Sequence, residues 1–170
     1  MSRLWVERRF AFDFPAEIYP MLIERLRGTP ARLEERLLTL TPQVLVKRPK
    51  EGWSIQEHAG HLIEVEALFD GRLGEFEKGL AELRPADMSN RRTEEAGFNE
   101  LQLADVLATF RGVRARFVER LESWPPEQFA QSALHPRLKT PMRACDMLFF
   151  MAEHDDHHLA RISELVRTFA

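Results

Sequence analysis

Long helical stripes of apolar residues constrain this chain more than any other feature. Apolar side chains recur every three or four residues from Ser54 to about Leu83, from about Asn99 to Ser123, and from Thr140-Pro141 almost to the chain end. Segments this long suit helices stacked side by side in a bundle better than a compact helical hairpin. Leu, Ala, Glu and Arg dominate the composition while Tyr and Ile are sparse, so backbone propensity also favours helix. The chain is therefore predicted to be all-α.

A fourth helical segment is broken in the middle. Its pattern starts near Pro15 and runs to Arg27, where Gly28-Thr29-Pro30 combines a helix stop with a new start. The pattern then continues to Thr41-Pro42. Counting this broken pair as one helix gives an up-and-down four-helix bundle, with residues 1–20 as an irregular N-terminal arm. The 44% of hydrophobic residues suffices for a single domain over residues 1–170.

Local signals mark the ends of the later helices. Ser54-Ile55-Gln56-Glu57 matches the capping box that opens a helix. Thr140-Pro141 combines a cap with a following proline, which predicts that the last helix begins there. The polar stretch from Pro85 to Gly97 is interpreted as a long loop, of a length that is often functional. The segment around His135-Pro136 is expected to be irregular.

Composition argues against several classes of protein. The net charge of -3 arises from acids and bases of both signs, so no broad cationic surface for nucleic acid is expected. The chain shows no apolar stretch that resembles a signal peptide or a membrane span, and a cytoplasmic protein is expected. The single Cys145 cannot form an internal disulfide, and its apolar neighbours predict a buried structural thiol.

Five of the six histidines fall within residues 57–61 and 154–158. Residues four apart share one face of a helix, so His154 and His158 can present two imidazoles to one ion. His158 falls within the apolar arc of its helix and His154 at the edge, whereas His157 points away. A buried neutral imidazole needs partners for both ring nitrogens, and a metal supplies one. The pair indicates a metal site, with histidines that bind no ligand as the competing interpretation.

The helix from Ser54 offers two candidates for a third ligand. Periodicity favours His58, which falls near the centre of the stripe that contains Ile55 and Leu62. His61 falls toward the edge of that stripe. The pattern alone leaves both candidates open.

Three charged residues also fall within apolar arcs: Glu66, Arg114 and Asp155. An unpaired buried charge is costly, so some of them are expected to pair internally or to orient the histidines. The alternative is that their side chains reach solvent at the edge of the bundle.

Other metal and catalytic motifs fit poorly. His154-Asp155-x-x-His158 is similar to the zinc-protease pattern His-Glu-x-x-His, but Asp replaces the Glu that acts as general base. The chain has no Gly-rich phosphate loop, no Gly-x-Ser-x-Gly elbow and no paired-cysteine zinc motif. A histidine-ligated ion is the chemistry that the sequence favours.

Taken in order along the chain, these residues resemble the DinB/YfiT-like superfamily of metal-dependent enzymes. The similarity spans about residue 22 to the end, and the pattern Trp-Ser-x-x-Glu-x-x-x-His-Leu with a C-terminal His-x-x-x-His is its most specific part. The matching stretches are Arg25 to Leu33, Gly52 to Glu66, His135-Pro136 with Thr140, and His154 to Ile162.

The resemblance implies a four-helix bundle that holds a metal through one histidine of its second helix and two of its fourth. The His-Leu step of the family falls on His61-Leu62, so the implied ligands are His61, His154 and His158, in place of the His58 that periodicity favours. It also implies a homodimer. Some members of the superfamily transfer low-molecular-weight thiols such as bacillithiol or mycothiol to electrophiles, or isomerise thiol adducts, and others have no established reaction.

The implied ligands are consistent with this chemistry. Three neutral imidazoles leave a divalent ion its full charge and an open position, where it lowers the pKa of a bound thiol or water. Zn²⁺ is expected first and Ni²⁺ second, because imidazole ligation distinguishes them poorly. The expected function is thiol S-transfer or hydrolysis, with a small-molecule thiol or electrophile as substrate. The alternative is a non-enzymatic stress-response or binding bundle with a structural metal or none.

Overall fold

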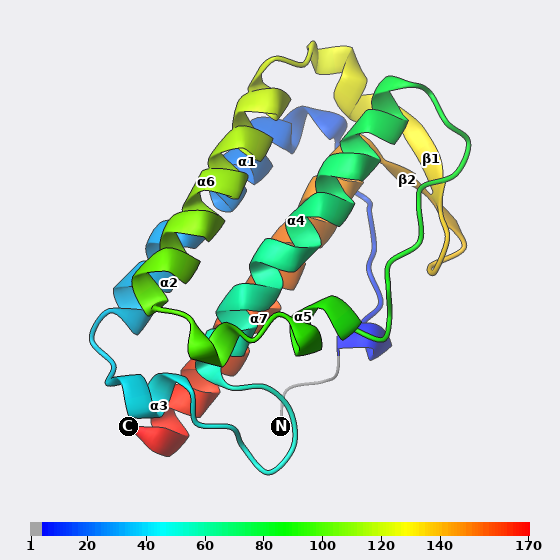
Figure 1. Ribbon diagram of the computed structural model, residues 1–170. Helices are drawn as coiled ribbons and strands as arrows, with labels where there is room; N and C mark the ends of the chain where they lie inside the picture. Colours follow the sequence, from blue (N-terminus) through cyan, green and yellow to red (C-terminus); the bar gives the residue numbers. More distant parts are fainter. Residues whose placement is uncertain (1–4) are drawn as a thin grey trace.

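Four helical columns lie side by side along the length of the molecule (Figure 1). This computed structural model describes residues 5–170, so the first four residues of the expected N-terminal arm lie outside it. α1 (Tyr19–Arg27) and α2 (Thr29–Leu37) form the first column; α4 (Ile55–Glu77), α6 (Leu103–Glu122) and α7 (Ala144–Phe169) form the others. The predicted all-α four-helix bundle is confirmed. The shorter helices are α3 (Pro42–Leu45), α5 (Arg91–Glu95) and the 3-10 helices Trp5–Glu7, Ala16–Ile18, Phe98–Glu100 and Pro126–Ala130.

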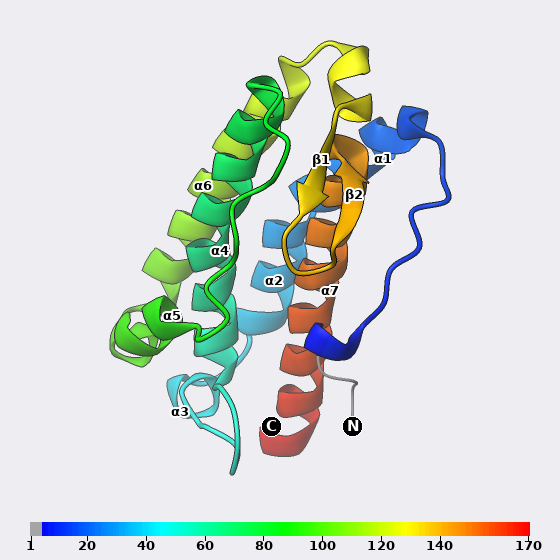
Figure 2. The same ribbon diagram turned by 90° about the vertical axis from the view of Figure 1, so that its right-hand side faces the viewer.

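The columns do not alternate strictly in direction, unlike the up-down-up-down order expected from the sequence. α4 packs against α6 and α7, and α1 packs against the same two helices. The pairs Glu66–Arg114 and Glu77–Arg120 show that α4 and α6 run parallel. They do so because residues 78–102 return along the bundle and carry α5 past the start of α4 before α6 begins (Figures 1 and 2). α7 runs antiparallel to α4, the condition for their histidines to meet.

The predicted start of α4 is confirmed. The Ser54 side chain accepts a hydrogen bond from the Glu57 N–H, and the Glu57 carboxylate accepts one from the Ser54 N–H. The helix ends at Glu77 rather than near Leu83, since Gly79 adopts a left-handed φ of 63° that ends the turn. α6 begins at Leu103 rather than Asn99, which lies in a 3-10 helix.

A β-hairpin occupies the segment that was expected to be irregular. β1 (Ser132–His135) pairs antiparallel with β2 (Thr140–Arg143), and His135 lies opposite Thr140. The expectation that Thr140-Pro141 begins the last helix is therefore wrong, and α7 begins at Ala144. Thr favours strands and Pro is tolerated at a sheet edge, so this dipeptide fits either structure.

A polar layer divides the apolar core into two halves. One half includes Phe69, Phe117 and Leu148, and the other includes Phe110 and Ile162. The polar residues that lie between them along α4, α6 and α7 are Glu66, Arg114, His154, Asp155 and His158. Cys145 is fully buried in the first half, and burial raises the pKa of its thiol to about 11, which agrees with a structural role.

No helix within residues 5–170 combines the length and the apolar character that crossing a membrane requires.

Candidate metal centre

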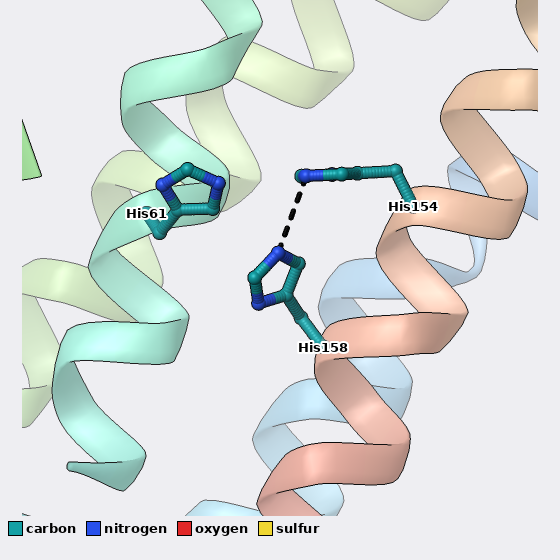
Figure 3. Close-up of side chains that lie close together, drawn as sticks. All are labelled: His61, His154 and His158. Atoms are coloured by element: carbon teal, nitrogen blue, oxygen red, sulfur yellow. Dashed lines mark hydrogen bonds between the residues drawn. The ribbon is translucent and has the colours of Figure 1, made fainter. Parts of the chain in front are cut away.

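The His61 ring lies beside the two histidines of the polar layer, His154 and His158, at 5.3 Å and 4.7 Å between ring centroids. Each offers one ring nitrogen, and the three nitrogens lie within 4.8 Å of one another. His61 projects from α4, and the other two project from successive turns of α7 (Figure 3). His154 Nε2 and His158 Nε2 are 3.2 Å apart. The structure therefore brings together the three residues that the family resemblance implied.

Two of the three rings are oriented by a second contact. His61 Nδ1 lies 2.9 Å from the Thr93 hydroxyl, which comes from α5, and His158 Nδ1 lies 2.9 Å from His58 Nδ1. Such contacts fix ring orientation and leave the Nε2 atom of each ring for a ligand. His58 thus lies behind His158, outside the cluster of three. Periodicity placed His58 correctly on the buried face of α4, but its ring contacts a ligand candidate instead of joining the cluster.

Thr93 was missed by the sequence analysis. Nothing in the polar stretch from Pro85 to Gly97 distinguishes this threonine from its neighbours, because its role depends on the return of residues 78–102 along α4. Thr93 is only 3% exposed. The stretch was expected to be a loop, but it contains the helix α5, and this helix carries the hydroxyl that contacts His61.

Aromatic rings flank the centre on two sides. The Trp53 ring lies 4.6 Å from the His61 ring and 6.1 Å from the His158 ring, measured between centroids. The Trp5 ring packs edge-on against His154 at 5.0 Å. His154 Nδ1 is buried and has no hydrogen-bond partner among the described residues. The two tryptophan rings thus cover two sides of the cluster.

Burial keeps the three histidines neutral. It lowers the pKa of His61 to about 4, with a smaller contribution from His157. Burial and then the neighbouring histidines lower the pKa values of His154 and His158 well below 6.5. A metal binds the neutral form of imidazole, so these rings are ready for an ion at neutral pH. The donor set, three neutral imidazoles from two helices, fits a divalent ion with room for a further ligand.

The charged residues of the polar layer pair with one another. Arg114 Nε donates to Glu66 Oε1 at 2.7 Å, and Arg114 Nη1 donates to Asp155 Oδ2 at 2.6 Å. The Leu26 carbonyl accepts from Arg114, and the Thr29 hydroxyl donates to Asp155. Internal pairing, one of the two sequence expectations, is therefore correct, and the network joins all four columns of the bundle. Burial raises the pKa of Glu66 to about 7, against the opposing effect of Arg114.

A comparison with protein families identifies the fold. The model of the DinB superfamily matches residues 25–162. The chain belongs to the DinB superfamily. Among curated proteins, none matches this chain.

Solved structures of other proteins agree with the observed architecture. YfiT from Bacillus subtilis, described as a probable metal-dependent hydrolase with an unusual four-helix bundle topology, is 22% identical with a TM-score of 0.76, covering 95% of this chain and 93% of that one. A mycothiol-dependent maleylpyruvate isomerase is 13% identical with a TM-score of 0.67. That alignment covers 87% of this chain but only 60% of the isomerase. At these identities the likeness establishes the fold.

Proposed function

We propose that this DinB protein is a metal-dependent enzyme in which His61, His154 and His158 bind one divalent ion. The observation that carries the proposal is the approach of three neutral imidazole nitrogens, from two helices, to within 4.8 Å of one another. Zn²⁺ is the first candidate and Ni²⁺ the second. The protein acts as a thiol S-transferase or as a hydrolase. In support, one structural neighbour is described as a probable metal-dependent hydrolase and another as an isomerase that depends on the thiol mycothiol.

The bound ion would supply a Lewis acid that lowers the pKa of a coordinated thiol or water. The residues of the chain hold the geometry. Thr93 and His58 fix the rings of His61 and His158. Trp53 and Trp5 shield the site from water, which strengthens every electrostatic interaction within it.

An activity assay with and without the metal tests the proposal. The purified protein is assayed with a panel of small thiols, electrophiles and esters before chelation, after chelation, and after reloading with Zn²⁺ or Ni²⁺. We expect one class of substrate to turn over with metal and to stop without it. His157→Ala is the matched control, since His157 lies beside His158 outside the cluster of three and its variant should keep the activity. Turnover that is unchanged by complete removal of the metal would contradict the proposal.

Burial of the three histidines supports a second candidate function, a non-enzymatic binding bundle that is stabilised by a structural ion. His61, His154 and His158 are 6%, 7% and 5% exposed, which also suits a structural ion in a non-enzymatic binding bundle. If the stripped protein unfolds and the loaded protein binds neither azide nor a thiol, the ion is structural. A stripped protein that stays folded and regains thiol transfer on reloading supports the enzyme.

Homodimer formation belongs to the same proposal, because the family resemblance implies it. Sedimentation equilibrium tests it directly: a mass of one chain at all concentrations would contradict a dimer.

A further inference from the structure

A second group of buried nitrogen donors lies apart from the histidine cluster. Arg72 lies on α4, three turns beyond His61, whereas His135 ends β1 and Arg137 lies in the turn that joins β1 to β2. The hairpin that carries the last two lies along the first half of α7 (Figure 2). His135 belongs to a stretch that the sequence analysis singled out, and the metal centre does not use it.

Each of the three side chains carries a nitrogen atom without a partner. Arg72 Nη1, His135 Nε2 and Arg137 Nη2 are buried and have no hydrogen-bond partner among the described residues. Arg72 is 1% exposed and His135 is 2% exposed. His135 and Arg137 both contact the Phe150 ring, and the charges of Arg72 and Arg137 both act on His135. A buried donor that makes no hydrogen bond is costly, and three in neighbouring side chains need an explanation.

All three nitrogens are donors. His135 Nδ1 accepts a hydrogen bond from the Leu138 N–H at 3.2 Å, which places the ring proton on Nε2. Burial, and then the charges of Arg72 and Arg137, lower the pKa of His135 to about 4, so the ring is neutral and Nε2–H remains a donor at neutral pH. The two guanidinium groups can only donate.

The positive charge of this group is only partly compensated. The Glu75 carboxylate, three residues after Arg72 on α4, opposes the lowering of the Arg72 pKa by burial. Arg84 nevertheless occupies both Glu75 oxygens, through Nε at 2.6 Å and through its backbone N–H at 2.8 Å. Arg72 itself donates to the Arg84 carbonyl from Nε and Nη2. The Arg84 side chain can lie there because Gly71 has no Cβ; one would come within 2.0 Å of Arg84 Nη1.

The group also adjoins the metal centre. The Phe69 ring lies 5.9 Å from the Arg72 guanidinium and 6.3 Å from the His154 ring. On the other side, the Phe150 ring lies 5.4 Å from the ring of His135 and 5.7 Å from the guanidinium of Arg137. Arg137 contributes to the lowered pKa of His154. The Phe69 ring thus lies between Arg72 and His154, so that about one side chain separates the unpaired donor of Arg72 from the nearest of the three histidines.

We propose that Arg72, His135 and Arg137 form an oxyanion-binding subsite that takes a carboxylate or phosphate group of a small molecule. Guanidinium N–H groups and an imidazole N–H match the oxygen atoms of such a group, and charge-assisted hydrogen bonds of this kind are among the strongest in proteins. The evidence for the subsite is the set of buried, unpaired donors and does not depend on the metal centre. The role of the subsite, holding the anionic end of the electrophile while the reactive end reaches the metal, rests on the proposed function.

Calorimetric titration with matched probes tests the subsite. Benzoate, phenyl phosphate and benzamide are titrated into the protein as purified, and we expect at least one of the two anions to bind while uncharged benzamide does not. Arg137→Gln and Arg72→Gln should each weaken that binding about tenfold or more, because each removes a charge-assisted donor. Arg120→Gln is the control, since Arg120 is an ion-paired arginine on α6 away from this group.

Three further measurements separate loss of the subsite from misfolding and from binding of the anion by the metal. Thermal unfolding confirms that each variant folds, and Arg137→Gln, at a half-buried turn residue, serves if Arg72→Gln does not fold. His158→Ala should retain anion binding, which separates the subsite from direct ligation of a carboxylate by the ion and from failure of the proposed function. Arg137→Lys should retain part of the affinity. Equal binding of benzamide, full affinity in folded Arg137→Gln, or the absence of binding by both anions would overturn the subsite.

Discussion

Two polar groups interrupt the core at the same level of the bundle, and they are built in opposite ways. In the Arg114 network, one cation meets the two carboxylates of Glu66 and Asp155, and the Thr29 hydroxyl and a carbonyl complete the hydrogen bonding. In the histidine cluster, three neutral rings turn nitrogen atoms toward one another. The first group satisfies itself apart from Glu66 Oε2, which has no partner among the described residues. The second would be completed by the proposed ion.

The difference shows what a charged or polar residue in an apolar helix arc can mean. Asp155 and His154 are neighbours in the sequence and both are buried, yet one neutralises an arginine and the other faces two more imidazoles. Burial alone does not separate a structural network from a binding site. The balance of donors, acceptors and charges does.

The largest effect is expected from breaking the Arg114 network. Arg114→Met leaves two carboxylates buried without a cation, which should lower the free energy of unfolding by about 3–5 kcal/mol. Urea denaturation measures the loss. The triple variant Glu66→Leu, Arg114→Met, Asp155→Leu removes all three charges and should recover much of it. If Arg114→Met were as stable as the wild type, the Arg114 network would not be stabilising the fold.

A pH titration of stability probes the histidine cluster. The folded pKa values of His61, His154 and His158 are lowered, to about 4 for His61, whereas the unfolded value is 6.5. The unfolded state therefore binds protons that the folded state excludes, and stability is full above pH 6.5 and falls as the pH drops toward 4.

Each such histidine contributes about 1.4 kcal/mol per pH unit within that window. Urea denaturation of the chelated protein at several pH values measures the slope, and His61→Ala should reduce it. A stability that does not change between pH 6.5 and pH 4 would contradict the neutral, buried state of these rings.

A smaller effect is expected from the residues that orient the ligands. Thr93→Val removes the hydroxyl beside His61 Nδ1, and His58→Leu removes the ring beside His158 Nδ1. Each should weaken Zn²⁺ affinity by about 10–100-fold without abolishing binding. Competition with a chromogenic chelator measures the affinity. Thr168→Val, at the far end of α7, is the control. Unchanged Zn²⁺ affinity in both variants would show that Thr93 and His58 do not orient the metal-binding rings.

Much of the bundle could be predicted because its causes are local. Apolar periodicity located α4, α6 and α7, and the Ser54 capping box located the start of α4 correctly. The spacing of His154 and His158 placed both on one face of α7. These features depend on the neighbours of a residue within a few turns.

The remaining features depend on contacts between distant parts of the chain. The choice of His61 over His58 came from the family resemblance, since both rings contact His158 on α7 and periodicity does not show which of them joins the cluster of three. Thr93 and the parallel pair of α4 and α6 follow from the path of residues 78–102, which periodicity does not describe. The hairpin at residues 132–143 was missed because Thr140-Pro141 is compatible with either element.

Metal analysis of matched histidine variants tests the central claim most directly. The untagged protein, purified without chelators, should contain about one equivalent of Zn²⁺ or Ni²⁺ per chain, and His61→Ala and His158→Ala should each lose it. His157→Ala, altered at the neighbouring histidine outside the cluster, should keep it. Full metal content in folded His61→Ala or His158→Ala, or a wild-type protein without metal that does not take up Zn²⁺ or Ni²⁺, would contradict the account.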